Sequence, residues 1–138
     1  MAMELDLIPR GTRAESNGDG AAFDISGSRT RTYICTLEIV EQIEQESLDV
    51  SVWGSADGEA WGTHPIIKLP QAFYRGEEQM VLDLTLRPEV KFIRARWELA
   101  RWGRVAPIPM FVFALKAAEI PAMPRTPATP GTLTAQAK

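Results

Sequence analysis

The fold class is indicated most clearly by residues 92–99, which read FIRARWEL and alternate apolar side chains with aromatic or charged ones. Successive side chains of an extended chain point to opposite faces, so this alternation puts one set on each side of a strand. One face would be apolar and would carry Ile93, Ala95, Trp97 and Leu99. The other would carry Arg94 and Arg96. We therefore predict a strand with one buried and one solvent-facing side, as in an antiparallel sheet.

The same two-residue period continues on both sides of this segment. Alternating apolar residues recur in stretches 33–39, 48–53, 81–86 and 110–115, and weaker strands are expected at 4–8, 21–25 and 65–69. Turn-forming clusters of glycine, proline, asparagine and aspartate separate them at 17–20, 26–28, 56–58, 75–76, 87–88 and 103–109. About eight strands at this spacing predict an all-β antiparallel sandwich or jelly roll. Residues 41–47 could form one helical turn, which is too short to change the class.

The organisation of the chain changes after residue 120. Its 138 residues, 45% of them hydrophobic, suit one domain with a buried core. Beyond that point proline recurs every third residue, at Pro121, Pro124, Pro127 and Pro130. Such a segment buries too little apolar area to offset its backbone entropy. We expect a β-sandwich domain at 1–120 and an extended tail at 121–138 that contacts another chain through Met123, Arg125 and Leu133.

Charge and cysteine content limit the partners and the cellular compartment expected for this chain. A net charge of -3 argues against a nucleic-acid partner. The single cysteine, Cys35, excludes an internal disulfide and favours a reducing compartment. The first residues are acidic where a signal peptide would be basic, and no apolar run is long enough for a transmembrane segment. These features predict a cytoplasmic or virion-like location without a signal peptide.

Candidates for catalysis or metal binding are few. The only histidine, His64, has no nucleophile motif beside it and is interpreted as a loop residue. Cys35 lies on the apolar face of its strand, where a cysteine is usually inert packing. One histidine and one cysteine cannot form a four-ligand zinc site, and the Asp-Gly loops have too few carboxylates at calcium spacing. We therefore expect no catalytic residue, cofactor or metal, and no enzyme.

Arginine and tryptophan residues are the candidates for partner binding. Arg94, Arg96, Arg101 and Arg104 could line one outer surface, with Trp102 as a surface contact supported by neighbouring arginines. An equally weighted alternative is that these arginines pair with acids on neighbouring strands, such as Glu38 or Asp49. By strand parity, Trp97 belongs to the core, and Trp53 is either exposed or covered by a loop.

The hairpin at 48–61 reads LDVSVWGSADGEAW and ends in the pattern Ser-x-Asp-Gly-x-x-Trp. Asp57 and Gly58 would make a tight turn with positive φ at Gly58, and Trp61 would fold back to cap the core. This element resembles the strand–turn–tryptophan unit of discoidin-like (factor V/VIII type C, galactose-binding-like) sandwiches. With the arginine-rich strand and Pro-x-Phe-x-Phe at 109–113, it is also similar to small β-sandwich proteins of phage heads and tails.

These resemblances imply a β-sandwich fold, and the lack of a catalytic motif favours a binding role over catalysis. The function expected is that of a structural or accessory subunit, which binds protein subunits within a virion-type or other multisubunit assembly. The alternative is a carbohydrate-binding module of the galactose-binding-like class, in which exposed tryptophans stack on sugars.

Overall fold

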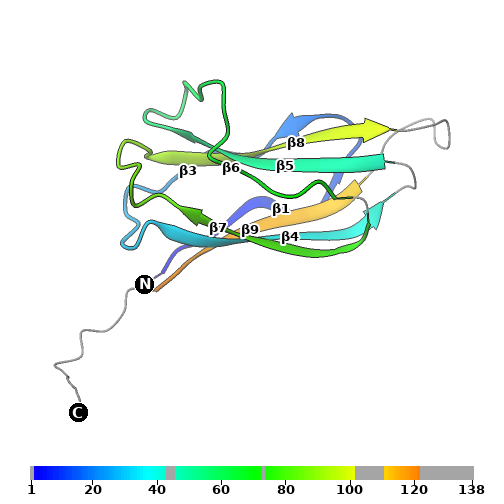
Figure 1. Cartoon of the computed structure of the whole chain (residues 1–138), viewed down its shortest axis with the longest axis horizontal. Coiled ribbons are helices and arrows are strands. Elements are labelled where there is room, and N and C mark those ends of the chain that lie inside the picture. The colour runs from blue at the N-terminus through cyan, green and yellow to red at the C-terminus, as the bar shows by residue number, and fades with distance from the viewer. Residues whose placement is uncertain (1, 43–45, 73, 102–110, 122–138) are drawn as a thin grey trace, which may run out of the picture.

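The chain folds as an all-β antiparallel sandwich. The computed structural model describes residues 2–42, 46–72, 74–101 and 111–121, and these residues form strands, turns and loops without a helix. Two sheets lie on one another as layers, and all their strand pairings are antiparallel (Figure 1). The predicted fold class is therefore confirmed.

The first layer is a four-stranded sheet in the order β1-β9-β4-β7. Its strands are β1 (Glu4–Ala14), β9 (Phe111–Glu119), β4 (Thr32–Gln42) and β7 (Gly76–Asp83). The long ladders that β9 and β7 make with β4 put β4 and β9 in the interior of this sheet and leave β1 and β7 at its edges.

The second layer is a five-stranded sheet built around the long pair β5–β8. Its path runs β2-β8-β5-β6, and β3 also pairs with β8. The strands are β2 (Gly18–Asp19), β3 (Phe23–Asp24), β8 (Phe92–Arg101), β5 (Glu46–Ser55) and β6 (Ile67–Lys68). Counting β2 and β3 as one interrupted edge strand leaves eight strands, and the chain passes repeatedly between the sheets, as in a jelly roll.

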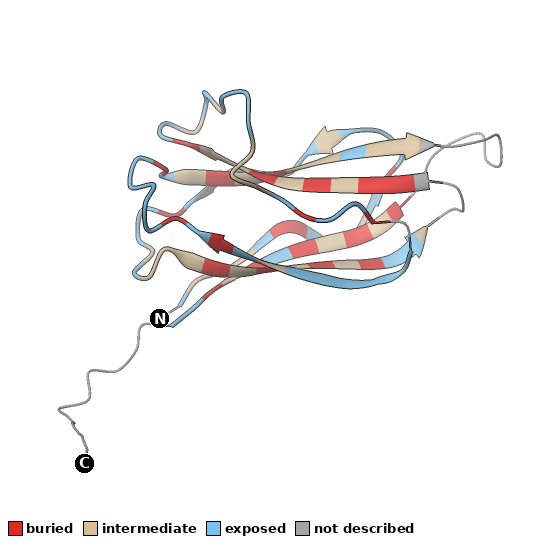
Figure 2. Cartoon of the chain, in the orientation of Figure 1, coloured by how far each residue is buried: buried red, intermediate tan, exposed pale blue. Residues whose placement is uncertain are grey.

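The core fills the space between the two layers. Buried positions alternate with mostly half-buried ones along β4 and β9, and Figure 2 shows the buried segments on the strands of both sheets. Tyr33, Phe111 and Phe113 are the largest fully buried side chains. Trp97 is half-buried on the inner side, where its ring meets Phe113 edge-on at 5.6 Å and its Nε1 donates to the Ser16 carbonyl at 3.0 Å. Most of the apolar positions predicted from the alternation in the sequence are therefore the ones that form the core.

Three local predictions are wrong. The strand expected at 81–86 ends at Asp83, whose carboxylate accepts the Thr85 N–H at 2.9 Å and turns the chain, so Leu86 is 90% exposed. The turn expected at 17–20 contains the short strand β2, paired with β8. The helical turn expected at 41–47 is replaced at both ends by strand, since β4 continues to Gln42 and β5 begins at Glu46.

A buried carboxylate joins the two ends of the described chain. Glu119, at the end of β9, is 5% exposed and accepts hydrogen bonds from the Met3 N–H, the Ser28 hydroxyl and the backbone of Arg29 and Thr30, at 2.7–3.0 Å. Burial alone would raise the pKa of Glu119, but the Ser28 hydroxyl and these N–H groups outweigh it and lower the pKa to about 2. We call this group of five residues the Glu119 clamp.

Arg31 fastens the adjoining loop. Its backbone adopts φ of +55°, a left-handed conformation that residues other than glycine rarely take. Its guanidinium donates to the carbonyls of Leu84, Arg87 and Val90 at 3.3, 2.7 and 2.9 Å. Arg31 therefore ties the start of β4 to the loop that leads into β8.

Candidate functional site: an arginine–tryptophan face

The candidate site lies on the outer face of the five-stranded sheet. In the β5–β8 register Trp53 lies opposite Arg94 and Ser51 opposite Arg96. The alternate positions on the same strands, among them Val50, Val52 and Ala95, are buried in the core. Because directly opposite residues share a face, the predicted outward side of β8 meets the outward side of β5 there.

The turn after β5 brings Trp61 to the same face. Gly58 adopts φ of +82°, the conformation that the Asp-Gly pair predicts. The Ser55 hydroxyl accepts the N–H of Asp57 at 3.2 Å and of Gly58 at 2.8 Å. The Asp57 carboxylate in turn accepts the N–H groups of residues 59 and 60, at 2.8 and 2.9 Å. These bonds, led by those from Ala60 and Glu59, lower the pKa of Asp57 to about 2.

Two tryptophans and two arginines pack together on this face. The Arg94 guanidinium carbon lies 4.4 Å from the centre of the Trp61 ring, and that of Arg96 lies 5.5 Å from the centre of the Trp53 ring. Both distances are within the range of cation–π attraction. All four side chains are partly exposed or exposed. We name the set Trp53, Trp61, Arg94 and Arg96 the Arg–Trp face. The Trp61 ring contacts Arg94, whereas a position capping the core was expected from the sequence.

The acids beside the Arg–Trp face differ from those predicted. Asp19, on β2, lies 4.0 Å from both Arg94 and Arg96, and Glu98 lies 3.9 Å from Arg96. Of the acids named from the sequence, Asp49 pairs with Lys68 at 3.9 Å, and Glu38 belongs to β4 in the other sheet. All these ion pairs are at the long end of the range, where exposed pairs contribute little. The Arg94 Nε atom is buried and, within the described residues, has no hydrogen-bond partner.

The side chains of the other residues predicted to contact a partner lie outside the described part of the chain. Arg101 lies opposite Glu46 in the backbone ladder, but its side chain is not described. Trp102 and Arg104, and the tail residues Met123, Arg125 and Leu133, lie outside the described residues. The predictions for these residues stay predictions. The structure brings together Arg94 and Arg96, and it adds Trp53, Trp61 and Asp19 to them.

The two residues considered for catalysis, His64 and Cys35, lie in a surface loop and in the core. His64 is exposed in the loop before β6, with its Nδ1 3.1 Å from the Thr63 hydroxyl. Cys35 is fully buried in β4, and burial raises the pKa of its thiol to about 12. Over the described ranges, no three side chains of the histidine, cysteine, aspartate and glutamate types gather as metal ligands.

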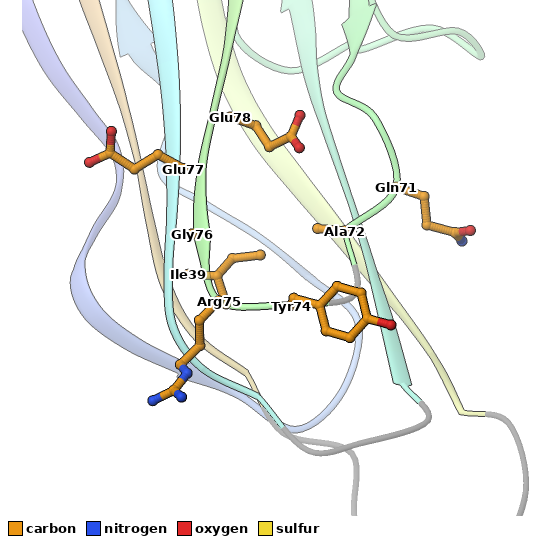
Figure 3. A pocket seen from close by; sticks show the side chains of 8 residues that line it. All are labelled: Ile39, Gln71, Ala72, Tyr74, Arg75, Gly76, Glu77 and Glu78. Carbon is orange, nitrogen blue, oxygen red and sulfur yellow. The ribbon is translucent and has the colours of Figure 1, made fainter.

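Two hollows lie elsewhere on the surface. One, of about 280 Å³, opens beside the start of β7, and Figure 3 shows its lining, from Ile39, Gln71, Ala72, Tyr74, Arg75, Gly76, Glu77 and Glu78. The other, of about 380 Å³, lies over the outer face of the four-stranded sheet and is lined by Asp6, Arg10, Thr36, Glu38, Glu77, Ala114 and Lys116. Both linings mix acidic and basic side chains.

Comparison with known proteins gives no family assignment, since neither a protein-family model nor a curated protein matches the sequence. In the part of the chain that the structure describes, no helix has the length and hydropathy needed to cross a bilayer.

Proposed function

We propose that this chain is a non-catalytic structural or accessory subunit that binds a protein partner, within a virion-type or other multisubunit assembly, through the Arg–Trp face. The observation that supports this proposal is the stacking of Trp61 on Arg94 and of Trp53 on Arg96 on one accessible sheet face. Tryptophan and arginine are the residue types most enriched in the energetic centres of protein interfaces.

The packing of the face favours binding. An arginine already held over an indole ring loses less side-chain freedom when a partner arrives than a free arginine would. The guanidinium groups of Arg94 and Arg96 are partly exposed, and their nearest acids lie 3.9–4.0 Å away, so both retain donor capacity for a partner. A complementary surface would therefore offer carboxylates or carbonyls beside flat apolar groups.

The test is incorporation of the full chain into its native assembly, measured by co-purification of tagged variants. We expect Trp61→Ala and Arg94→Ala to reduce incorporation strongly, since central interface residues of these types contribute about 2 kcal/mol or more, which is about thirtyfold in affinity. Lys116→Ala is the matched control, because Lys116 is an exposed cation of the other sheet, in β9. Wild-type incorporation of both variants, with unchanged melting temperatures, would contradict the proposal.

A carbohydrate-binding module is the second candidate. It is supported by two tryptophan rings on one accessible face and by the resemblance of the 48–61 hairpin to galactose-binding-like sandwiches. Titration with galactose and with galactose-terminated oligosaccharides would then change tryptophan fluorescence in a saturable way. Trp53→Ala would abolish that change, whereas His64→Ala, in an exposed loop, would leave it intact. A flat titration would exclude these sugars as ligands and leave the protein-binding proposal standing.

A further inference from the structure

The edges of the two sheets are protected to different degrees. Edge strands β2, β3 and β6 have two residues each. Edge strand β1 is long, but its pairing with β9 is shifted between Asp6 and Ile8 and again between Ile8 and Thr12, and it contains Pro9. Edge strand β7 has eight residues, no proline and no shift in its pairing with β4. Short length, bulges, proline and charged side chains are the usual protections against edge-to-edge pairing. Of these, β7 has only the charges, at Glu77 and Glu78 near its start and Asp83 at its end.

The backbone of β7 offers hydrogen-bonding groups on its free side. Just beyond the strand, the Leu84 N–H donates to the Arg31 carbonyl at 2.8 Å, in step with the β4–β7 ladder. In an antiparallel ladder the bonding direction alternates with each residue. The even-numbered residues of β7 therefore bond toward β4, and the N–H and C=O groups of Glu77, Gln79 and Val81 point toward the free edge.

The side chains of β7 leave this edge accessible. Figure 3 shows Glu77 and Glu78 on opposite sides of the strand, as the alternation requires, with Arg75 extending away from the adjacent hollow. Glu77, Glu78 and Gln79 are exposed, and Val81 is 51% exposed on the outer side. In the described part of the chain no strand lies beside the Val81 N–H and C=O, and an exposed valine placed in this way suits a partner strand better than it suits water.

We propose that β7 pairs antiparallel with β7 of a second copy of this chain, with Gln79 opposite Gln79 at the two-fold axis. Such a pairing would join two four-stranded sheets into one continuous sheet. The proposal is independent of the proposed function, whose residues lie on the other sheet.

Several antiparallel registers would pair most of β7 with β7 of a second copy, and electrostatic repulsion disfavours all but the one centred on Gln79. A two-fold pairing that keeps the outer faces together sets odd residues opposite odd ones and even opposite even. Centring on Glu78 would place that carboxylate opposite itself, and centring on Met80 would place Glu77 opposite Asp83. Both bring like charges together, which is unfavourable.

Centring on Gln79 avoids these repulsions. It places Glu77 opposite Val81, and Glu78 opposite Met80, of the second copy. It also brings exposed Arg75, just before β7, alongside Asp83 of the second copy. The self-complementary order of basic, neutral and acidic positions is the reason for choosing a second copy as the occupant. A register centred on Val81 is also free of like charges, but it would pair only the second half of the strand.

The test measures self-association of the full chain by sedimentation velocity over a concentration series. We expect a monomer–dimer equilibrium in the wild type. Gln79→Pro should abolish the dimer, because proline removes an N–H that points to the free edge and none that bonds to β4. Its melting temperature, measured at a concentration where the wild type is monomeric, should stay close to that of the wild type.

A charge pair at the two-fold axis tests the register itself. Gln79→Glu and Gln79→Lys each place like charges opposite one another, so each variant alone should dimerise about fivefold more weakly. An equimolar mixture of the two should recover dimerisation as a heterodimer. Ala22→Glu is the control, since it adds the same charge on the exposed segment between β2 and β3, beside the opposite edge of the other sheet, and should not change association.

Two results would overturn the proposal. One is a wild type that stays monomeric at high concentration, which would mean that Glu77 and Glu78 are sufficient to block edge pairing. The other is a dimer that Gln79→Pro leaves unchanged. A dimer lost in Gln79→Pro but not recovered by mixing the glutamate and lysine variants would overturn the register centred on Gln79.

Discussion

The Glu119 clamp and the Arg–Trp face both hold charged side chains, but they differ in how completely those charges are paired. The Glu119 carboxylate is buried and accepts hydrogen bonds from four residues at short range. Arg94 and Arg96 are partly exposed, have their nearest acids at 3.9–4.0 Å and stack on tryptophan rings. A fully satisfied buried charge stabilises the fold, whereas an incompletely satisfied accessible one retains capacity for a ligand. The comparison predicts that substitutions in the clamp change stability, and substitutions in the face change binding.

The largest effect is expected for Glu119→Ala. Removal of the carboxylate leaves the Met3, Arg29 and Thr30 N–H groups and the Ser28 hydroxyl without their acceptor, which should lower the free energy of unfolding by about 3 kcal/mol. Denaturant unfolding measures it. Glu98→Ala, which removes an exposed carboxylate beside the Arg–Trp face, is the matched control and should change stability by less than about 0.5 kcal/mol. Equal effects of the two substitutions would invalidate the comparison.

The pH dependence of stability should separate the same two regions. The pKa of Glu119 is about 2 in the folded protein, below its ordinary value of 4.5, so the folded state binds fewer protons between those values. The clamp's contribution is therefore complete above about pH 4.5 and is lost as the pH falls toward 2. Exposed Asp57 has a lowered pKa in the same window, so the informative quantity is the difference between wild type and Glu119→Gln. That difference should shrink on acidification, and a constant difference from pH 6 to pH 2.5 would contradict the assignment.

The turn that supports the Arg–Trp face should show an intermediate effect. Gly58→Val should destabilise by about 1–2 kcal/mol, because a β-branched residue resists the φ of +82°. An added Cβ would also meet the Phe92 ring at 3.4 Å. Gly62 has a similar φ of +74° with open space around it, so Gly62→Val measures the backbone effect alone. Thermal melts of the two variants should rank Gly58→Val as the more destabilised, and a neutral result would remove the claim that this turn needs glycine.

The smallest effect on stability is expected within the Arg–Trp face itself. Arg96→Ala removes a cation–π contact at 5.5 Å and two long ion pairs, which should together change the free energy of unfolding by less than about 1 kcal/mol. The same variant should lose partner binding in the co-purification experiment. If it destabilises the domain as much as Glu119→Ala does, the face is a structural element and the comparison fails.

Local alternation of side chains was sufficient to predict most of the sandwich. Residues 33–39, 48–53 and 92–99 lie within β4, β5 and β8, and their apolar sets face the core. The prediction failed where a side chain interrupts the pattern. Leu82, Leu84 and Leu86 alternate perfectly, but the Asp83–Thr85 turn ends the strand between them. The first half of β7 was missed because its residues are polar on both sides at a solvated edge.

The candidate site depends on contacts that one sequence does not encode locally. Arg94 and Arg96 were identified from the parity of their own strand, but their partners depend on the pairing register with Trp53 and on the loop that carries Trp61. Asp19 joins them from a segment that the sequence marks only as a turn. The Glu119 clamp was not anticipated, because its partners are separated from Glu119 by about 90 residues or more along the chain.

The reactivity of Cys35 can report local opening of the four-stranded sheet. This single thiol lies fully buried in β4, opposite Met80 of β7 on one side and Ala117 of β9 on the other. A thiol reagent such as a disulfide dye needs an exposed thiolate, so it should label the chain only when these strands separate. The labelling rate then measures how often the four-stranded sheet opens locally under native conditions, without denaturant and without an engineered probe. Because β7 borders this thiol, the same rate should slow with rising protein concentration if a second copy covers that edge.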